Sequence, residues 1–235
     1  MAQNSAASTP VVNTVVPLSE KNGPLVWIDC EMTGLDPAKD KLLEIAVVIT
    51  NGDLERVDDG INLIIHREKE VLDKMDQWCT DQHGSTGLTQ ACLESTHTVE
   101  AVSSQVLSYI QKWIPQKKIA HLSGNSVHQD RLFLLQEMPE VVNWLHYRIV
   151  DVSSIKVLTK RWCPQYAHVP GFNNHRYPSS LHLNTFPDWA LDRALDDILG
   201  SIQELQSYRQ NIFLRAAHTT KGAGDGRAAN ADIYE

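Results

Sequence analysis

Hydrophobic residues in this chain occur in short runs separated by polar, turn-forming stretches. Residues 25–30 and Leu42–Thr50 are nearly uninterrupted apolar runs, which predict two buried β-strands. A third strand is expected over residues 54–66, with a break at residues 58–60. The connections between these three strands are short, so we expect an antiparallel meander.

The rest of the chain alternates between helical and strand patterns. Residues 98–114 give the clearest amphipathic helix, with Val99, Val102, Val106 and Ile110 along one face. Further helices are expected over residues 68–82, 126–136, 153–161 and 194–213, and further strands over residues 119–123 and 147–152. This order predicts an α/β fold in which a mixed five-stranded sheet carries helices on both faces.

Length and composition indicate one sizeable globular domain with tails. The chain has 235 residues, of which 42% are hydrophobic and 21% charged. We expect a folded domain over residues 23–216, with a disordered N-terminal segment (1–22) and a disordered, Gly-rich C-terminal tail (217–235). No run approaches the roughly 18 apolar residues of a membrane helix, so no membrane association is expected.

Charge and cysteine content limit which binding partners and which cellular locations are expected for this protein. A net charge of −8 argues against binding to long duplex nucleic acid. The four cysteines form no CxxC pair, which is typical of reduced intracellular thiols. Residues 1–22 lack a secretory signal and contain no Arg, so both the cytoplasm and the mitochondrion stay open as locations.

Two acids at the end of the first strand suggest a metal site. Asp29 and Glu31 are two residues apart, so their side chains point to the same face. No Lys or Arg lies between Asn22 and Ala38 to compensate their charge. A hard divalent cation such as Mg²⁺ or Mn²⁺ is the economical partner. The alternative is a pair of solvated acids where a strand reaches the surface.

Two helix starts add further acids. Asp130 follows Ser126 at the predicted beginning of one helix, and Asp197 precedes the apolar face of the last helix. Ser126 could be a helix cap, and an acid at Asp130 also suits the helix dipole. Together with Asp29 and Glu31, however, these residues supply four oxygen donors, which is typical of a site with two metal ions.

Four motifs, in order, resemble the oligoribonuclease family, the 3′-to-5′ exoribonucleases of the DEDDh group. They are W-I-D-x-E-M-T-G-L at residues 27–35, G-N-S-x-x-Q-D-R at 124–131, H-Y-R-x-x-D-V-S at 146–153 and A-L-D-D-I at 194–198. The resemblance implies a ribonuclease H-like fold, a homodimer, and degradation of short single-stranded RNAs, above all dinucleotides, to mononucleotides. It assigns the ligands of two Mg²⁺ or Mn²⁺ ions to Asp29, Glu31, Asp130 and Asp197.

The resemblance also implies substrate contacts. It likens Leu35 and Trp78 to residues that contact bases, and His83 to a histidine near the substrate. It assigns a cap on the substrate's 5′ phosphate to Ser126, Arg148 and Ser153. It likens Tyr147 to a tyrosine that reaches the partner subunit's active site. Without the resemblance, Trp78 would be read as a core residue and Tyr147 as a half-buried strand residue.

The chain departs from the family at the general base. The family places a histidine five residues before the last aspartate, where this chain has Asp192. The sequence His175-Arg176 matches the start of that motif, and Ala194 resumes it. One interpretation is a natural replacement of the histidine by Asp192, but a carboxylate beside four others is a poor general base. The interpretation that fits better is a 17-residue insert at residues 177–193, either a translated retained intron or a gene-model error, with His175 as the base.

Three functions are therefore compared. The leading one is a metal-dependent 3′-to-5′ exoribonuclease. The second is a catalytically impaired dinucleotide-binding homologue, because the insert displaces the histidine. The third is an exonuclease acting on single-stranded DNA, which differs from the first in tolerating a substrate without the 2′-hydroxyl.

Overall fold

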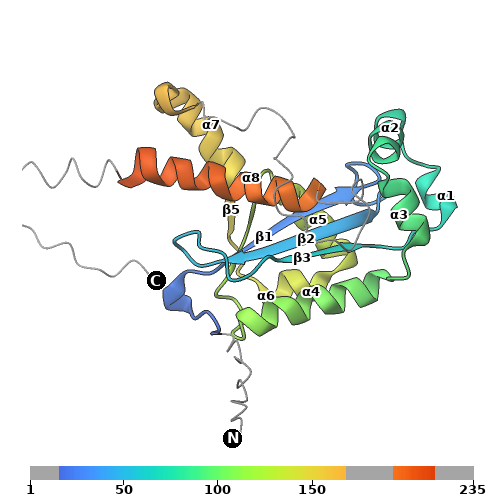
Figure 1. Cartoon of the computed structure of the whole chain (residues 1–235), viewed down its shortest axis with the longest axis horizontal. Coiled ribbons are helices and arrows are strands. Elements are labelled where there is room, and N and C mark those ends of the chain that lie inside the picture. Colours follow the sequence, from blue (N-terminus) through green and yellow to red (C-terminus); the bar gives the residue numbers. More distant parts are fainter. Residues whose placement is uncertain (1–15, 168–192, 215–235) are drawn as a thin grey trace, which may run out of the picture.

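The computed structural model describes residues 16–167 and 193–214, which contain a five-stranded mixed sheet (Figure 1). The strand order is β3-β2-β1-β4-β5, so β1 is central. The pairs β1–β2 and β2–β3 are antiparallel, whereas β1–β4 and β4–β5 are parallel. The strands are β1 (Leu25–Met32), β2 (Leu42–Thr50), β3 (Ile61–Ile64), β4 (His121–Gly124) and β5 (Ile149–Asp151). The predicted meander and fold class are confirmed.

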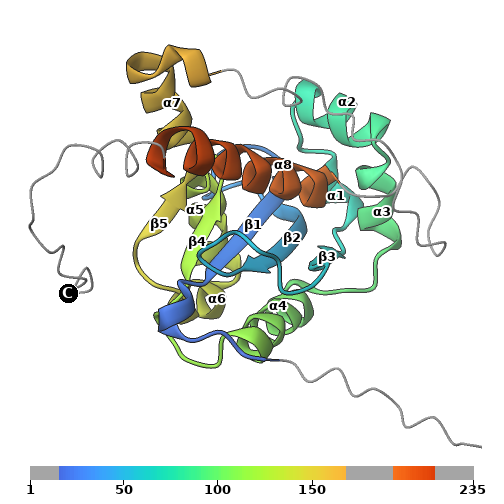
Figure 2. The same ribbon diagram turned by 60° about the vertical axis from the view of Figure 1, so that its left-hand side comes forward.

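Helices cover both faces of the sheet. In Figures 1 and 2, α8 crosses one face, while α4 and α6 lie on the other. The α-helices of the described part are α1 (Lys69–Leu72), α2 (Gln77–Ser85), α3 (Leu88–Glu94), α4 (Val99–Trp113), α5 (His128–Glu137), α6 (Pro139–Trp144), α7 (Val152–Trp162) and α8 (Arg193–Tyr208). Short helical turns add η1 (Glu20–Asn22), η2 (Pro164–Tyr166) and η3 (Arg209–Phe213). Within these described ranges, no helix combines the length and apolarity needed to cross a bilayer.

The alternation of side chains along β1 decides which face carries the acids. Val26 and Ile28 belong to the core that includes α4, α5 and α6. Trp27 belongs to a second core, formed mainly with α8. Since residues two apart share a face, Asp29 and Glu31 lie on the α8 side. The strand pattern therefore brings both acids under the helix that carries Asp197.

Two predicted elements are shorter than expected, for local reasons. The helix predicted over 68–82 divides into α1 and α2, because the Asp76 side chain caps α2 by accepting from the Cys79 N–H at 2.8 Å. The strand predicted over 54–66 keeps only β3. Gly60, with φ 88°, makes the turn before it, and a Cβ there would overlap the Val47 carbonyl oxygen. The helices α3 and α6 were not predicted.

The ordered part begins earlier than residue 23. Residues 20–22 form η1, and the Leu18 N–H donates to the Trp113 carbonyl at 2.7 Å. This backbone contact ties residues 16–22 to α4, so this part of the predicted disordered segment is structured. Residues 1–15 and 215–235 and most of the predicted insert lie outside the described residues. All four cysteines are free.

Trp27 gives a test of the core under α8. Its side chain is fully buried, and its indole N–H donates to the Thr50 Oγ1 at 3.0 Å. Thr50→Val keeps the shape of the side chain but leaves a buried donor without an acceptor. We expect the free energy of unfolding to fall by about 1–3 kcal/mol in urea titrations.

The double variant Trp27→Phe and Thr50→Val removes the donor as well. We expect the Thr50→Val substitution to cost less in the Trp27→Phe background than in the native chain, because no orphaned donor remains. Equal costs in the two backgrounds would show that the hydrogen bond is not important for stability.

Candidate active site

Three carboxylates from two elements meet at one point on the α8 side of the sheet. Asp29 and Glu31 come from the end of β1, and Asp197 comes from the start of α8. One oxygen atom from each of them lies within 4.8 Å of the other two. The fold thus brings Asp197, which is distant in the chain, to the two neighbouring acids of β1.

Asp130 approaches the same site from the opposite side of β1. It lies in the first turn of α5, its side chain is only 5% exposed, and its Oδ1 accepts from the Cys30 N–H at 2.9 Å. Its oxygens are not among the three that lie within 4.8 Å. Even so, among the neighbouring charges, that of Asp130 raises the pKa of Asp29 the most, after the effect of burial. Asp130 is therefore a neighbour of the cluster, held against β1, the central strand of the sheet.

Burial and crowding make the carboxylates difficult to ionise together. Burial raises the pKa of Asp29 well above its usual value, and repulsion from Asp130, Asp197, Glu31 and Glu44 raises it further. Burial also raises the pKa of Asp130 to about 7, although the Cys30 N–H opposes this shift. Oxygen donors concentrated in this way suit a hard divalent cation, which would offset their repulsion.

Glu44 is a fifth acid beside the cluster, which sequence reasoning did not identify. It lies on β2 directly opposite Glu31, and it is completely buried. Its Oε1 accepts from the Asn62 Nδ2 at 2.8 Å. The available signal was a single acid inside the otherwise apolar run of β2. Its position indicates that it adds negative charge behind Glu31.

Leu35 and Trp78 are exposed near the end of β1. The exposed fraction is 74% for Leu35 and 70% for Trp78, so Trp78 is not a core residue. The turn that carries Leu35 is held by Asp40, whose carboxylate accepts from the Thr33 hydroxyl at 3.1 Å and from the Asp36 N–H at 2.9 Å. Figure 1 shows α2, the helix of Trp78, beside this end of the sheet.

His83 is buried instead of exposed to a ligand. Only 2% of the residue is accessible, and its Nε2 lies 2.9 Å from the Met32 carbonyl oxygen. This contact joins α2 to the last residue of β1. The ring therefore supports the strand that carries Asp29 and Glu31, and its predicted contact with substrate stays a prediction.

Ser126 and Ser153 come together through Asp151. The two hydroxyl oxygens are 3.2 Å apart. The Asp151 Oδ1 accepts from the N–H of Ser126 at 3.0 Å and from that of Ser153 at 2.9 Å. Ser126 has a φ of 50° and lies before the N-cap of α5, so it does not cap that helix as the alternative reading expected. The arrangement presents two adjacent hydroxyls at the surface.

Tyr147 and Arg148 lie at the other end of the sheet. They precede β5, which runs parallel to β4 and β1, so they are near the amino ends of these strands, whereas the acids are at the carboxyl end of β1. Tyr147 is 68% exposed, which excludes the half-buried alternative. Its ring stacks on His146 at 4.4 Å, and the Arg148 guanidinium is 5.3 Å from the ring. The Arg148 guanidinium thus lies against the Tyr147 ring.

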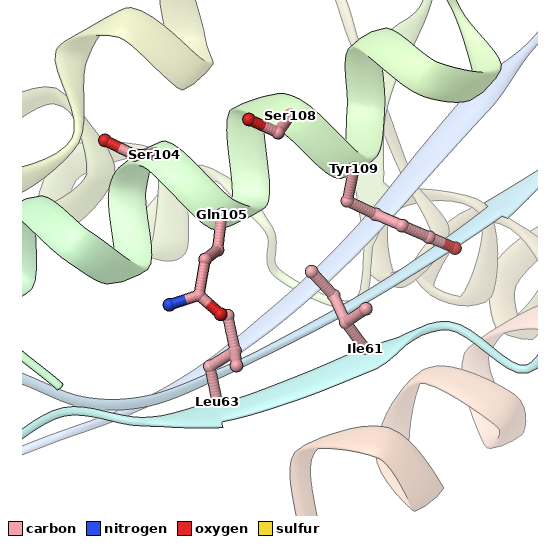
Figure 3. A pocket seen from close by; sticks show the side chains of 6 residues that line it. All are labelled: Ile61, Leu63, Ser104, Gln105, Ser108 and Tyr109. Carbon is pink, nitrogen blue, oxygen red and sulfur yellow. The ribbon is translucent and has the colours of Figure 1, made fainter. Parts of the chain in front are cut away.

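A surface groove is present elsewhere, between β3 and α4 (Figure 3). Its volume is about 370 Å³, and its lining consists of Ile61, Leu63, Ser104, Gln105, Ser108 and Tyr109. None of these side chains is acidic or basic, and α4 covers the sheet face opposite α8. The groove is therefore separate from the carboxylate cluster.

Comparison with known proteins assigns the family. The profile of an exonuclease family, RNase T, matches residues 26–182. A protein of Schizosaccharomyces pombe named probable oligoribonuclease is 46% identical over 192 residues, which cover 82% of this chain and 69% of that protein. The oligoribonuclease of Neisseria meningitidis serogroup A is 40% identical over 200 residues, covering 85% of this chain and 97% of that one. The chain belongs to the oligoribonuclease family.

Solved structures agree with the fold expected of an oligoribonuclease. Exonuclease I of Escherichia coli, solved with a 5cy-dA13 oligonucleotide, matches with a TM-score of 0.60 and 10% identity over 85% of this chain. A zinc-bound complex of the same enzyme with single-stranded DNA gives 0.59 and 12% over 87%. This chain spans less than half of either structure, 43% and 46% respectively. The ribonuclease H-like fold is thereby confirmed.

The oligoribonuclease motif around the general base lies largely outside the described residues. His175 and Asp192 are not among them, and the family profile ends at residue 182, inside the segment 177–193. The description resumes at Arg193, the first residue of α8. Both the role of His175 and the origin of the insert stay predictions.

The raised pKa values predict how the metal-free protein responds to pH. An Asp130 that titrates near pH 7 when folded and near 3.8 when unfolded binds more protons in the folded state between these values. Stability should therefore decline as the pH rises from about 4 to about 7, and Asp29 should act in the same direction. Thermal unfolding in EDTA across this range measures the effect.

Mg²⁺ or Mn²⁺ should raise the unfolding temperature most at and above pH 7, where the carboxylates are ionised. Asp130→Asn serves as the matched variant, since it removes one titrating group at nearly constant volume. We expect a flatter pH profile for Asp130→Asn without metal. A profile identical to that of the native chain would contradict the assigned burial of this carboxyl.

Proposed function

We propose that this chain is a metal-dependent 3′-to-5′ exoribonuclease that degrades short single-stranded oligoribonucleotides, above all dinucleotides, to mononucleotides. The observation that carries the proposal is the convergence of Asp29, Glu31 and Asp197 within 4.8 Å, with Asp130 against the same strand. The names of the relatives support the substrate class, since they are called oligoribonucleases.

These four carboxylates would hold two hard cations, Mg²⁺ or Mn²⁺. Bound there, the cations would polarise the phosphate and lower the pKa of a water molecule. The residues of the chain would orient the scissile phosphate between the end of β1 and the start of α8. His175, five residues from Asp197 once the insert is excluded, would take the proton of the attacking water.

The exposed apolar groups and the paired hydroxyls would select the substrate. Leu35 and Trp78 are exposed at the acid end of the sheet, as a surface for base stacking requires. The hydroxyls of Ser126 and Ser153, 3.2 Å apart, would donate to the 5′ phosphate. Arg148, which lies beside Tyr147 at the other end of the sheet, would join this cap from a second subunit. A cap of this kind would exclude longer chains by steric contact.

A homodimer would complete the site. Tyr147 is exposed at the end of the sheet opposite the acids, so it is well placed to contact a second subunit instead of its own site. The neighbouring edge helix α7 also exposes apolar side chains, including Val157 and Trp162. An apolar surface beside an edge strand is typical of an interface between subunits.

Relatives from human, mouse and cattle are named mitochondrial oligoribonucleases, whereas other relatives are bacterial. We therefore propose an intracellular location, in the cytoplasm or the mitochondrion.

Turnover of a diribonucleotide tests the activity. With Mn²⁺ or Mg²⁺, the chain should convert a 5′-phosphorylated diribonucleotide to mononucleotides, measured by chromatography. Asp197→Asn should lower kcat by more than about 100-fold, because losing a metal ligand should cost at least as much as losing a residue that only orients one. Faster hydrolysis of the matched deoxyribodinucleotide would instead favour the DNA exonuclease.

The insert is tested in the same assay. Deleting residues 177–193 should increase the rate, since it returns His175 to its family spacing, whereas replacing them by a Gly/Ser segment of equal length should not. Dinucleotide binding with no turnover in either form would favour the catalytically impaired homologue. A long form that is the only transcript and is fully active would remove the idea that the insert is an intron.

Tyr147 is tested by complementation between subunits. Tyr147→Ala and Asp29→Asn should each reduce activity as homodimers. After mixing and exchange of subunits, a mixed dimer contains one site with intact acids and an intact Tyr147 from its partner. Half of the dimers should be mixed and each should have one intact site, so activity should return to about a quarter of the native value. Mixing that restores nothing would place Tyr147 outside the partner's site.

A further inference from the structure

A continuous chain of hydrogen bonds connects the helix of Asp197 to the hydroxyls of Ser126 and Ser153. The Ser201 Oγ donates to the Asp197 carbonyl oxygen at 2.9 Å, and the Asn125 Nδ2 donates to the Ser201 Oγ at 2.8 Å. The Ser153 Oγ then donates to the Asn125 Oδ1 at 3.1 Å, and the Ser126 Oγ to the Ser153 Oγ at 3.2 Å. Within this series, Asn125 is the residue that bonds both to Ser201 on α8 and to Ser153 on α7.

The Asn125 amide is oriented by Ser201 and lies beside Glu204. This buried carboxylate accepts from the Tyr208 hydroxyl at 2.6 Å and lies 3.1 Å from the Lys156 Nζ, which joins α7 to α8. Its Oε2 also accepts from the Asn125 Nδ2 at 3.5 Å. The Ser201 hydroxyl donates its hydrogen to the Asp197 carbonyl and therefore accepts from Asn125, so the NH₂ group of Asn125 faces α8 and its carbonyl faces Ser153.

These contacts link three elements that the proposed reaction uses together. Asn125 lies between β4 and α5, Ser153 is on α7, and Ser201 is one turn after Asp197 on α8. The carboxylates would hold the cleaved phosphate, and the two hydroxyls would hold the 5′ phosphate. In a 5′-phosphorylated dinucleotide, a single nucleoside separates these two phosphates, so the distance between the groups that hold them decides which substrate fits.

We infer that Asn125 is a positioning residue that sets the separation between the carboxylate cluster and the Ser126–Ser153 pair, and so determines selectivity for a 5′-phosphorylated dinucleotide. The inference rests on the proposed function, because it assigns the 5′ phosphate to the two hydroxyls. Asn125 need not contact the substrate. Its effect passes through Ser153, whose hydroxyl it orients, and through Ser201, which fixes it to α8.

The test measures binding, so it does not depend on the activity of the full chain. Calorimetric titrations with Ca²⁺ in place of Mg²⁺ give the Kd of a diribonucleotide with a 5′ phosphate and of the same dinucleotide with a 5′ hydroxyl. The ratio of the two values is the selectivity for the phosphate. We expect Asn125→Ala and Ser201→Ala to lower this ratio about tenfold, which corresponds to one charge-assisted hydrogen bond.

Two controls separate positioning from general destabilisation. Ser207→Ala makes the same change on the same helix, away from the chain of hydrogen bonds, and should leave the ratio unchanged. Ser201→Thr keeps a hydroxyl acceptor and should retain most of the selectivity. A loss of folded protein in any variant reduces the binding of both dinucleotides equally, and therefore does not change the ratio of their Kd values.

The outcomes distinguish this inference from the function on which it rests. A native chain that binds the phosphorylated dinucleotide preferentially, with Asn125→Ala and Ser201→Ala keeping that preference, would overturn the inference and leave the proposed function intact. A native chain without any preference for the 5′ phosphate would overturn the proposed cap, and the inference with it. A reduced ratio in both alanine variants, restored by Ser201→Thr, would support the role of Asn125.

Discussion

The mutual repulsion of buried carboxylates is the constraint on which this active site depends. Asp29 is surrounded by the charges of Asp130, Asp197, Glu31 and Glu44, and it is also removed from water. Such a group of like charges does not assemble by its own interactions. The apolar contacts of the fold must therefore bring the acids together, and the concentrated negative charge then favours a hard cation over any other ligand.

The apolar contacts that meet this requirement are adjacent to the acids in sequence. Trp27 is two residues before Asp29 on the same face of β1, and Ile198 follows Asp197 on α8. Both belong to one buried cluster, so packing of α8 against the sheet necessarily brings the two aspartates near each other. On the opposite face, the core of α5 holds Asp130 against β1 at the Cys30 N–H. The carboxylate cluster is thus a consequence of two cores meeting at one strand.

This arrangement explains which features could be predicted from the sequence. The period-2 pattern of β1 is sufficient to place Asp29 and Glu31 together, and Asp197, which the sequence adds to them, lies in the same cluster. Asp130, which the sequence also groups with them, lies beside the cluster, bound to the Cys30 N–H. Glu44 was missed because one acid in an apolar run gives no periodic signal, and only the pairing of β1 with β2 places it opposite Glu31. Asn125 belongs to one of the motifs, but the sequence predicts no role for it, since its two partners, Ser153 and Ser201, come from distant helices. The division of the helix at Asp76 was missed because a local side-chain cap overrode a continuous apolar spacing.

The same physical reasoning limits what the insert can disturb. It ends at Arg193, the first residue of α8, and this helix packs with Ala194 and Ile198 fully buried in the core beneath it. The full chain, which contains residues 177–193, still brings Asp197 within 4.8 Å of Asp29 and Glu31. Ser201 and Glu204, farther along α8, also keep their contacts with Asn125. Residues 177–193 separate His175 from Asp197 in sequence, whereas the packing of α8 against the sheet keeps Asp197 beside Asp29 and Glu31. In the proposed function, cation binding by these carboxylates and proton transfer by His175 would therefore be separable properties of this chain.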